Sequence, residues 1–110
     1  PCCAGNNYPL RGGKHSVWEG GIRMAAFVSG GLLPQDRVGK IENGMISVAD
    51  WYTTFCEMVG VDPFDENGAK HNLPPVEGYD MWPLISGVNA TSPRTLLPID
   101  TSTLIQGKYK

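Results

Sequence analysis

The residues best suited to chemistry are a lysine and the glycines around it, in the segment 10–23. Lys14 follows two glycines, and a second pair of glycines stands at positions 20 and 21. Glycine lets backbone N–H groups turn toward a bound anion, and lysine adds a compact positive charge with three donors. The segment is therefore a candidate anion site. A lysine in a glycine-rich turn is also commonly just solvated, so the pattern by itself leaves both interpretations open.

A phosphate-binding P-loop is the obvious rival interpretation of this segment. That motif needs a glycine five positions before the glycine that precedes the lysine, and a serine or threonine directly after the lysine. Tyr8 and His15 stand at those two positions. The pattern therefore excludes a P-loop.

Charged neighbours of Lys14 allow two interpretations each. Glu19 and Arg23, four residues apart, could act as acid and base, but we favour a structural pair that holds the glycine turn near the lysine. Arg11 could face the anion or brace the loop, and we leave it out of the site.

The histidines and cysteines form no pattern typical of a metal site. His15 and His71 lack spaced partners, so we interpret each as a surface or hydrogen-bonding residue. Cys2, Cys3 and Cys56 have neither Cys-x-x-Cys nor histidine spacing, and their odd number does not fit a paired disulfide framework. We assign no metal ligand within the chain.

Composition describes a small globular chain of loop-rich, mixed architecture. The 110 residues are 41% hydrophobic and 18% charged, which permits one domain at most, with a thin core. Fourteen glycines and nine prolines predict many turns and short elements. A net charge of −2 gives no basic footprint for nucleic acid, and no apolar run is long enough for a membrane span.

Several short elements are expected to position the lysine segment. The apolar run 25–28 predicts a buried strand directly after it. Apolar residues at intervals of three and four over 48–59 predict a helix that ends at Gly60, capped either by Ser47 with Asp50 or by Asp50 itself. A surface loop at 62–78, a short amphipathic segment at 79–85 and strands at 95–99 and 104–106 follow.

Several motifs in order resemble the sulfatase family, most of all its arylsulfatase B-type members. Residues 6–14 (Asn-Asn-Tyr-Pro-Leu-Arg-Gly-Gly-Lys) and 18–23 (Trp-Glu-Gly-Gly-Ile-Arg) are similar to the family's lysine segment. Further similarity follows at residues 50–54, 77–82, 93–95 and 107–110. Thr53 departs from the family's pattern, because a proline is expected in that first helical turn.

The resemblance implies an α/β fold of the alkaline-phosphatase-like sulfatase type, of which this chain is a partial C-terminal segment. Residues 1–60 would contribute the end of the catalytic sheet region with the lysine loop and a helix. Residues 61–110 would contribute a loop and the start of the C-terminal subdomain. The remainder of the sulfatase domain is thus an expected partner.

The resemblance also implies a hydrolase that cleaves sulfate monoesters of the aryl sulfate or sulfated glycan type. Lys14 would be both the catalytic and the substrate-binding residue of this chain. The family also uses a formylglycine and a divalent cation, usually calcium. Cys2 and Cys3 do not begin the family's Cys-x-Pro-x-Arg motif. We therefore expect nucleophile and metal ligands outside this chain, which should be inactive alone.

Location and modification follow from the same resemblance and from one triplet. Family members imply the secretory pathway, with a lysosomal or extracellular destination. Asn89, followed by Ala and Thr in a turn-like stretch, is a candidate glycosylation site. Two alternative functions stay open: a noncatalytic remnant that binds sulfated ligands, and a related phosphodiesterase of the alkaline phosphatase superfamily.

Overall fold

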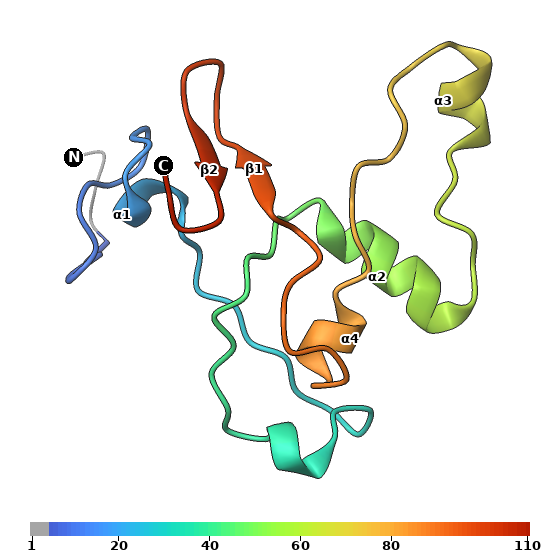
Figure 1. Ribbon diagram of the computed structural model, residues 1–110, viewed down its shortest axis with the longest axis horizontal. Helices are drawn as coiled ribbons and strands as arrows, with labels where there is room; N and C mark the ends of the chain where they lie inside the picture. Colours follow the sequence, from blue (N-terminus) through green and yellow to red (C-terminus); the bar gives the residue numbers. More distant parts are fainter. Residues whose placement is uncertain (1–4) are drawn as a thin grey trace. The chain divides into compact units, whose positions relative to one another are not determined.

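A computed structural model describes residues 5–110, in which short elements are joined by long irregular segments (Figure 1). The elements fall into two units, one made of residues up to Val28 together with Leu96–Lys110, the other of Ser29–Thr95. The first unit holds α1 (Glu19–Ile22), β1 (Leu96–Pro98) and β2 (Leu104–Gln106). The second holds a 3-10 turn, η1 (Gln35–Arg37), and the helices α2 (Asp50–Val59), α3 (Glu66–Lys70) and α4 (Trp82–Ile85).

Helix α2 confirms the helix expected from apolar spacing, and its start matches neither capping scheme in full. The Ser47 hydroxyl accepts the Ala49 N–H at 3.3 Å, while the Asp50 carboxylate accepts the Ser47 N–H at 2.7 Å. The Asp50 carboxylate thus reaches back as in a capping box, but the Ser47 hydroxyl accepts from Ala49 and not from Asp50, and the N-cap residue Ala49 makes no side-chain cap. At the other end Gly60 adopts φ 71°, the left-handed conformation that ends many helices.

The fully buried residues of α2 are polar, whereas its apolar side chains are at most half-buried. Asp50 and Thr54 are fully buried, whereas Phe55 is 58% exposed. The Thr54 hydroxyl explains this orientation, since it donates to the Asp50 carbonyl at 2.7 Å and accepts the Met81 N–H at 2.9 Å. The apolar stripe predicted for this helix is present, but much of it faces outward within the described part of the chain.

The core of the second unit is small and lies around α4. Met81, Leu84 and Ile85 are its buried apolar side chains, and the half-buried residues packed against them are Leu33, Ile46, Trp51 and Trp82. Arg37 donates through Nε to the Ile85 carbonyl at 3.1 Å, which satisfies an oxygen left free at the helix end. The thin core expected from chain length is confirmed.

A buried ion pair joins α2 to the end of the second unit. The Nε atom of Arg94 donates to both carboxylate oxygens of Asp50, at 3.1 and 2.9 Å. Asp50 also accepts the Tyr79 N–H at 2.9 Å, and the Arg94 guanidinium lies 4.9 Å from the centre of the Tyr79 ring. A further donation from Arg94 reaches the Glu77 carbonyl at 3.1 Å. The pair therefore holds the turn at 77–82 against the helix.

The ionisation of Asp50 is set by competition between burial and its donors. Burial alone raises the pKa of the carboxyl group, but the hydrogen bonds from Arg94, Tyr79 and Ser47 outweigh it and lower the pKa. A folded pKa below the ordinary value of 3.8 means that Asp50 stabilises the fold at neutral pH. That contribution is lost as the pH falls below 3.8 and through the folded pKa.

Two expectations about local structure are wrong. Residues 25–28 form no strand, and Phe27 is 91% exposed, because no other strand of residues 5–110 pairs with this segment. The loop expected at 62–78 contains α3, which begins where the Asp65 side chain accepts the Gly68 N–H at 2.9 Å.

The two strands expected near the end of the chain are confirmed and pair with each other. Strands β1 and β2 are antiparallel, with Leu97 opposite Ile105. The Ile99 and Asp100 N–H groups both donate to the Thr103 carbonyl and close the hairpin. The division of the chain at residue 60 stays a prediction.

Replacing Arg94 by methionine should destabilise the second unit by about 3–5 kcal/mol, because Asp50 would keep a buried charge without its partner. Urea unfolding of the protein, followed by tryptophan fluorescence, measures this loss. Arg23→Met is the control: Arg23 is exposed, and its substitution should change stability by no more than about 0.5 kcal/mol. Equal urea midpoints for both variants would contradict a stabilising role for the pair.

Candidate functional site

Lys14 lies in a closed four-residue turn of the first unit. The Ser16 N–H donates to the Gly13 carbonyl at 3.0 Å, and the Ser16 hydroxyl both donates to that carbonyl at 2.7 Å and accepts the Gly13 N–H at 3.2 Å. His15 takes a left-handed φ of 69° within the turn. Lys14 is exposed, and within residues 5–110 its ammonium makes no hydrogen bond or ion pair. The ammonium is therefore available to an anion.

The glycines around Lys14 serve close packing rather than direct anion binding. The Gly13 N–H is engaged by Ser16, and the Gly20 N–H donates to the Arg11 carbonyl at 2.8 Å. A Cβ atom on Gly21 would collide with the carbonyl oxygens of Ser16 and Gly13. The expectation that glycine N–H groups point to an anion is thus wrong for Gly13 and Gly20. The second glycine pair instead lets α1 lie directly against the lysine turn.

Arg11 braces the loop. Its guanidinium carbon lies 4.0 Å from the centre of the Trp18 ring, a cation–π contact. The Asn7 side-chain amide donates to the Gly12 carbonyl at 3.3 Å and ties the preceding segment to the same turn. Of the two roles left open for Arg11, the structure supports the structural one.

The sequence led us to expect an ion pair between Glu19 and Arg23, but the structure does not contain it. Its carboxylate lies 3.0 Å from the Lys110 ammonium, while Arg23 donates its backbone N–H to the Glu19 carbonyl at 2.8 Å. Sequence reasoning missed Lys110 because its partner is 91 residues away and no local periodicity relates the two. The motif at 107–110 was the one signal that could have drawn attention to it.

The remaining histidines and cysteines fall outside any constellation. A ring nitrogen of His71 lies 2.8 Å from the Asn67 carbonyl, which confirms a hydrogen-bonding role. Cys56 is a free, half-buried thiol. Cys2 and Cys3 lie outside the described residues.

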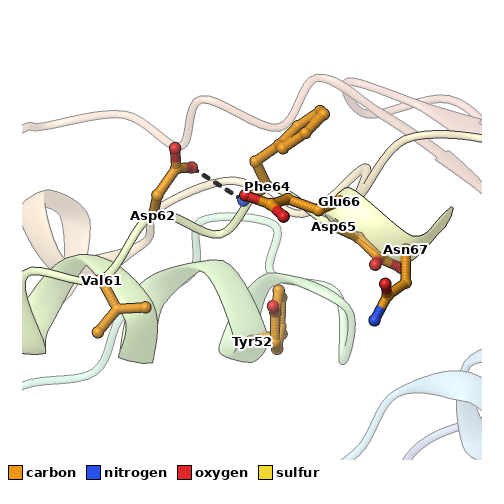
Figure 2. A pocket seen from close by; sticks show the side chains of 7 residues that line it. All are labelled: Tyr52, Val61, Asp62, Phe64, Asp65, Glu66 and Asn67. Carbon is orange, nitrogen blue, oxygen red and sulfur yellow. Dashed lines mark hydrogen bonds between the residues drawn. The ribbon is translucent and has the colours of Figure 1, made fainter. Parts of the chain in front are cut away.

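One hollow of about 390 Å³ lies beside α2 and α3 (Figure 2), but it contains no predicted site residue. Its lining residues are Tyr52, Val61, Asp62, Phe64, Asp65, Glu66 and Asn67. Two of its carboxylates are already used locally: Asp62 accepts the Phe64 N–H at 2.9 Å, and Asp65 caps α3. These two carboxylates of the hollow therefore have structural roles.

The described part of the chain lacks both a cluster of metal-ligating side chains and a membrane-spanning helix. Nowhere in residues 5–110 do three His, Cys, Asp or Glu side chains gather in a way that could hold a metal ion. The same residues contain no helix of the length and apolarity that crossing a membrane requires. The residues that the structure describes therefore provide no metal site of their own.

Asn89 lies in an exposed turn after α4. Its backbone N–H donates to the Pro83 carbonyl at 2.8 Å, and both Asn89 and Thr91 are exposed. Glycosylation requires access of an enzyme to this triplet, and the turn provides it.

Sequence comparison finds a relative of this chain among the arylsulfatases. Arylsulfatase J of Mus musculus is 36% identical to the chain over 86 residues, which are 78% of this chain and 13% of that relative. The chain is therefore similar to part of an arylsulfatase, as a fragment of a sulfatase would be. No family model matches the chain, and neither does any solved structure.

The similarity to an arylsulfatase supports part of the fold prediction made from the sequence. A sulfatase relative suggests the alkaline-phosphatase-like α/β fold. The short helices and one two-stranded sheet of residues 5–110 neither confirm nor contradict that fold. The chain spans 13% of the length of the relative, so the activity of the whole protein is a separate question.

Replacing Gly21 by alanine should push α1 away from the lysine turn, because the added Cβ meets two backbone oxygens that cannot move aside cheaply. Hydrogen exchange of the Gly20 amide, which donates to Arg11, should then be faster. Gly31→Ala is the control, since a Cβ there meets nothing within 4 Å. Unchanged exchange in the Gly21 variant would show that the close approach does not hold the loop.

Asn89 is expected to carry an N-linked glycan when the protein passes through the secretory pathway. A glycan-releasing enzyme should shift the mass of the peptide that contains Asn89, and Thr91→Ala should abolish the shift. Asn72→Gln is the control, because Asn72 lies in no such triplet. An unmodified peptide from secreted protein would contradict the assignment.

Proposed function

We propose that the protein containing this chain hydrolyses sulfate monoesters of the aryl sulfate or sulfated glycan type, and that Lys14 binds the sulfate oxygens. One observation carries the proposal: in a segment related to an arylsulfatase, a rigid turn presents the Lys14 ammonium to solvent. Arg11 and Glu19, which flank Lys14 in the sequence, are engaged elsewhere, Arg11 with the Trp18 ring and Glu19 with Lys110. Within the turn 13–16, Lys14 therefore presents an ammonium without a hydrogen bond or ion pair among the described residues.

A fixed cation suits this chemistry because negative charge shifts among the sulfate and leaving-group oxygens as the S–O bond breaks. A preorganised ammonium aimed at those oxygens stabilises the transition state without having to reorient. Two unit charges 4 Å apart interact by about 1 kcal/mol in water but by about 4 kcal/mol near a protein surface. An exposed lysine therefore gains catalytic strength only when substrate and protein walls exclude water around it.

The proposal includes a formylglycine and a divalent cation, with calcium as the expected metal. The metal would supply charge neutralisation at the sulfate and the formylglycine would supply the nucleophile. No residue of this chain is assigned to hold either group, because the described residues gather no ligand set. A lysosomal or extracellular location is proposed from the arylsulfatase relationship.

The test is sulfate release from a chromogenic aryl sulfate by the full-length protein, produced together with formylglycine-generating enzyme. Lys14→Ala should lower kcat/KM at least about a hundredfold, or about 2.7 kcal/mol of transition-state stabilisation. Lys40→Ala is the matched control, since it removes an exposed lysine from the other unit.

Three other outcomes would replace the proposal. Equal activity of the Lys14 variant and the unaltered protein would remove Lys14 from the site. Sulfate binding without turnover would favour a noncatalytic binding protein. Turnover of a phosphodiester in place of a sulfate ester would favour a related phosphodiesterase.

A further inference from the structure

Lys110 is held in place by the hairpin that precedes it. The Gln106 and Tyr109 backbones exchange two hydrogen bonds, at 2.9 and 3.0 Å, directly after β2. This turn delivers the Lys110 ammonium to the Glu19 carboxylate at 3.0 Å, with side chains 26% and 44% exposed. The contact lies within the first unit, so it links the hairpin to the lysine loop.

Glu19 lies next to the residues that pack against the Lys14 turn. It begins α1, and the following residue, Gly20, donates its N–H to the Arg11 carbonyl at 2.8 Å. Gly21 then lies against the backbone of Gly13. The carboxylate of Glu19 is therefore attached to the same packed backbone that carries Lys14.

Carboxylates are scarce in this part of the chain. Glu19 is the one acidic side chain in residues 5–28. The other acid of the first unit is Asp100, whose carboxylate accepts the Ser102 N–H at 2.7 Å and the Ser102 hydroxyl at 2.9 Å in its own turn. Glu19 is thus the nearest carboxylate along the chain that could compete with a sulfate group for the Lys14 ammonium.

We propose that Lys110 is a positioning residue: it engages Glu19 and so keeps the competing carboxylate away from Lys14. The inference rests on the proposed function, because it concerns the same anion site. Lys110 acts through Glu19 and does not touch the substrate. Removing Lys110 leaves Glu19 free to pair with Lys14, whereas removing both side chains leaves Lys14 without a competitor.

If Lys110 acts in this way, the three variants should differ in KM in a characteristic order. In the full-length protein, Lys110→Met should raise KM for an aryl sulfate about fivefold, the upper range for competition by a partly exposed ion pair, with kcat little changed. Glu19→Gln should stay within about twofold of the unaltered protein, because its amide cannot compete as an anion. The double variant should recover to within about twofold.

A purely structural salt bridge would give another order, since breaking it from either side would cost the same. Equal losses in Lys110→Met and Glu19→Gln would therefore overturn the proposal. A double variant as impaired as Lys110→Met would also overturn it, because Lys110 would then contact the anion itself.

Direct binding of inorganic sulfate, measured by calorimetry for the same set of proteins, separates this inference from the proposed activity. Absent turnover with the expected order of sulfate affinities would refute the hydrolase and support the role of Lys110. Turnover together with equal sulfate affinities in all variants would support the hydrolase and refute the role of Lys110. Absence of sulfate binding in the unaltered full-length protein would overturn both.

Discussion

The second unit depends on neutralising one carboxylate. Asp50 has no exposure to solvent, so its charge is tolerable only with the donors it has: Arg94 and the N–H groups of Ser47 and Tyr79. Those donors come from three separate stretches of sequence, and binding them fixes where the stretches meet. The polar side of α2 must consequently face inward, and aromatic side chains such as Phe55 face outward. An electrostatic requirement, more than apolar burial, therefore orients this helix.

In the first unit, a few short-range contacts hold the lysine turn in place. Its lysine turn is held by Ser16 and by the close approach of Gly21, so no charged group near it needs to hold the backbone. Charged side chains are instead matched outside the turn, Arg11 with an aromatic ring and Glu19 with Lys110. Rigidity without a local counter-ion is the condition that an anion site needs, because a lysine already paired must give up its partner before it binds a ligand.

The sequence predicts the elements whose causes are local. Helix α2 and its end at Gly60 follow from spacing and capping within a few residues, and β1 and β2 follow from short β-prone runs between turns. The failures concern causes that lie elsewhere in the chain. An apolar run such as 25–28 becomes a strand only where another strand supplies its hydrogen bonds, and Glu19 finds a partner 91 residues away. Helix α3 had a local signal in Asp65, hidden among the loop-forming residues around it.

The sequence also predicts the candidate site only in part. Residue type and spacing identify a cation among glycines, but they do not separate a functional lysine from a solvated one. The resemblance of the surrounding residues to sulfatase motifs favours the functional interpretation, which stays a prediction. The structure then changes the explanation of the glycines, which are needed for packing rather than for donating to an anion. It also shows what the turn contributes: the turn fixes the backbone that carries Lys14, while the strength of the ammonium's interaction with an anion depends on how much water the bound substrate and surrounding protein remove. This chain thus supplies the backbone position of Lys14, whereas a low dielectric around the ammonium requires substrate and surrounding protein to exclude water.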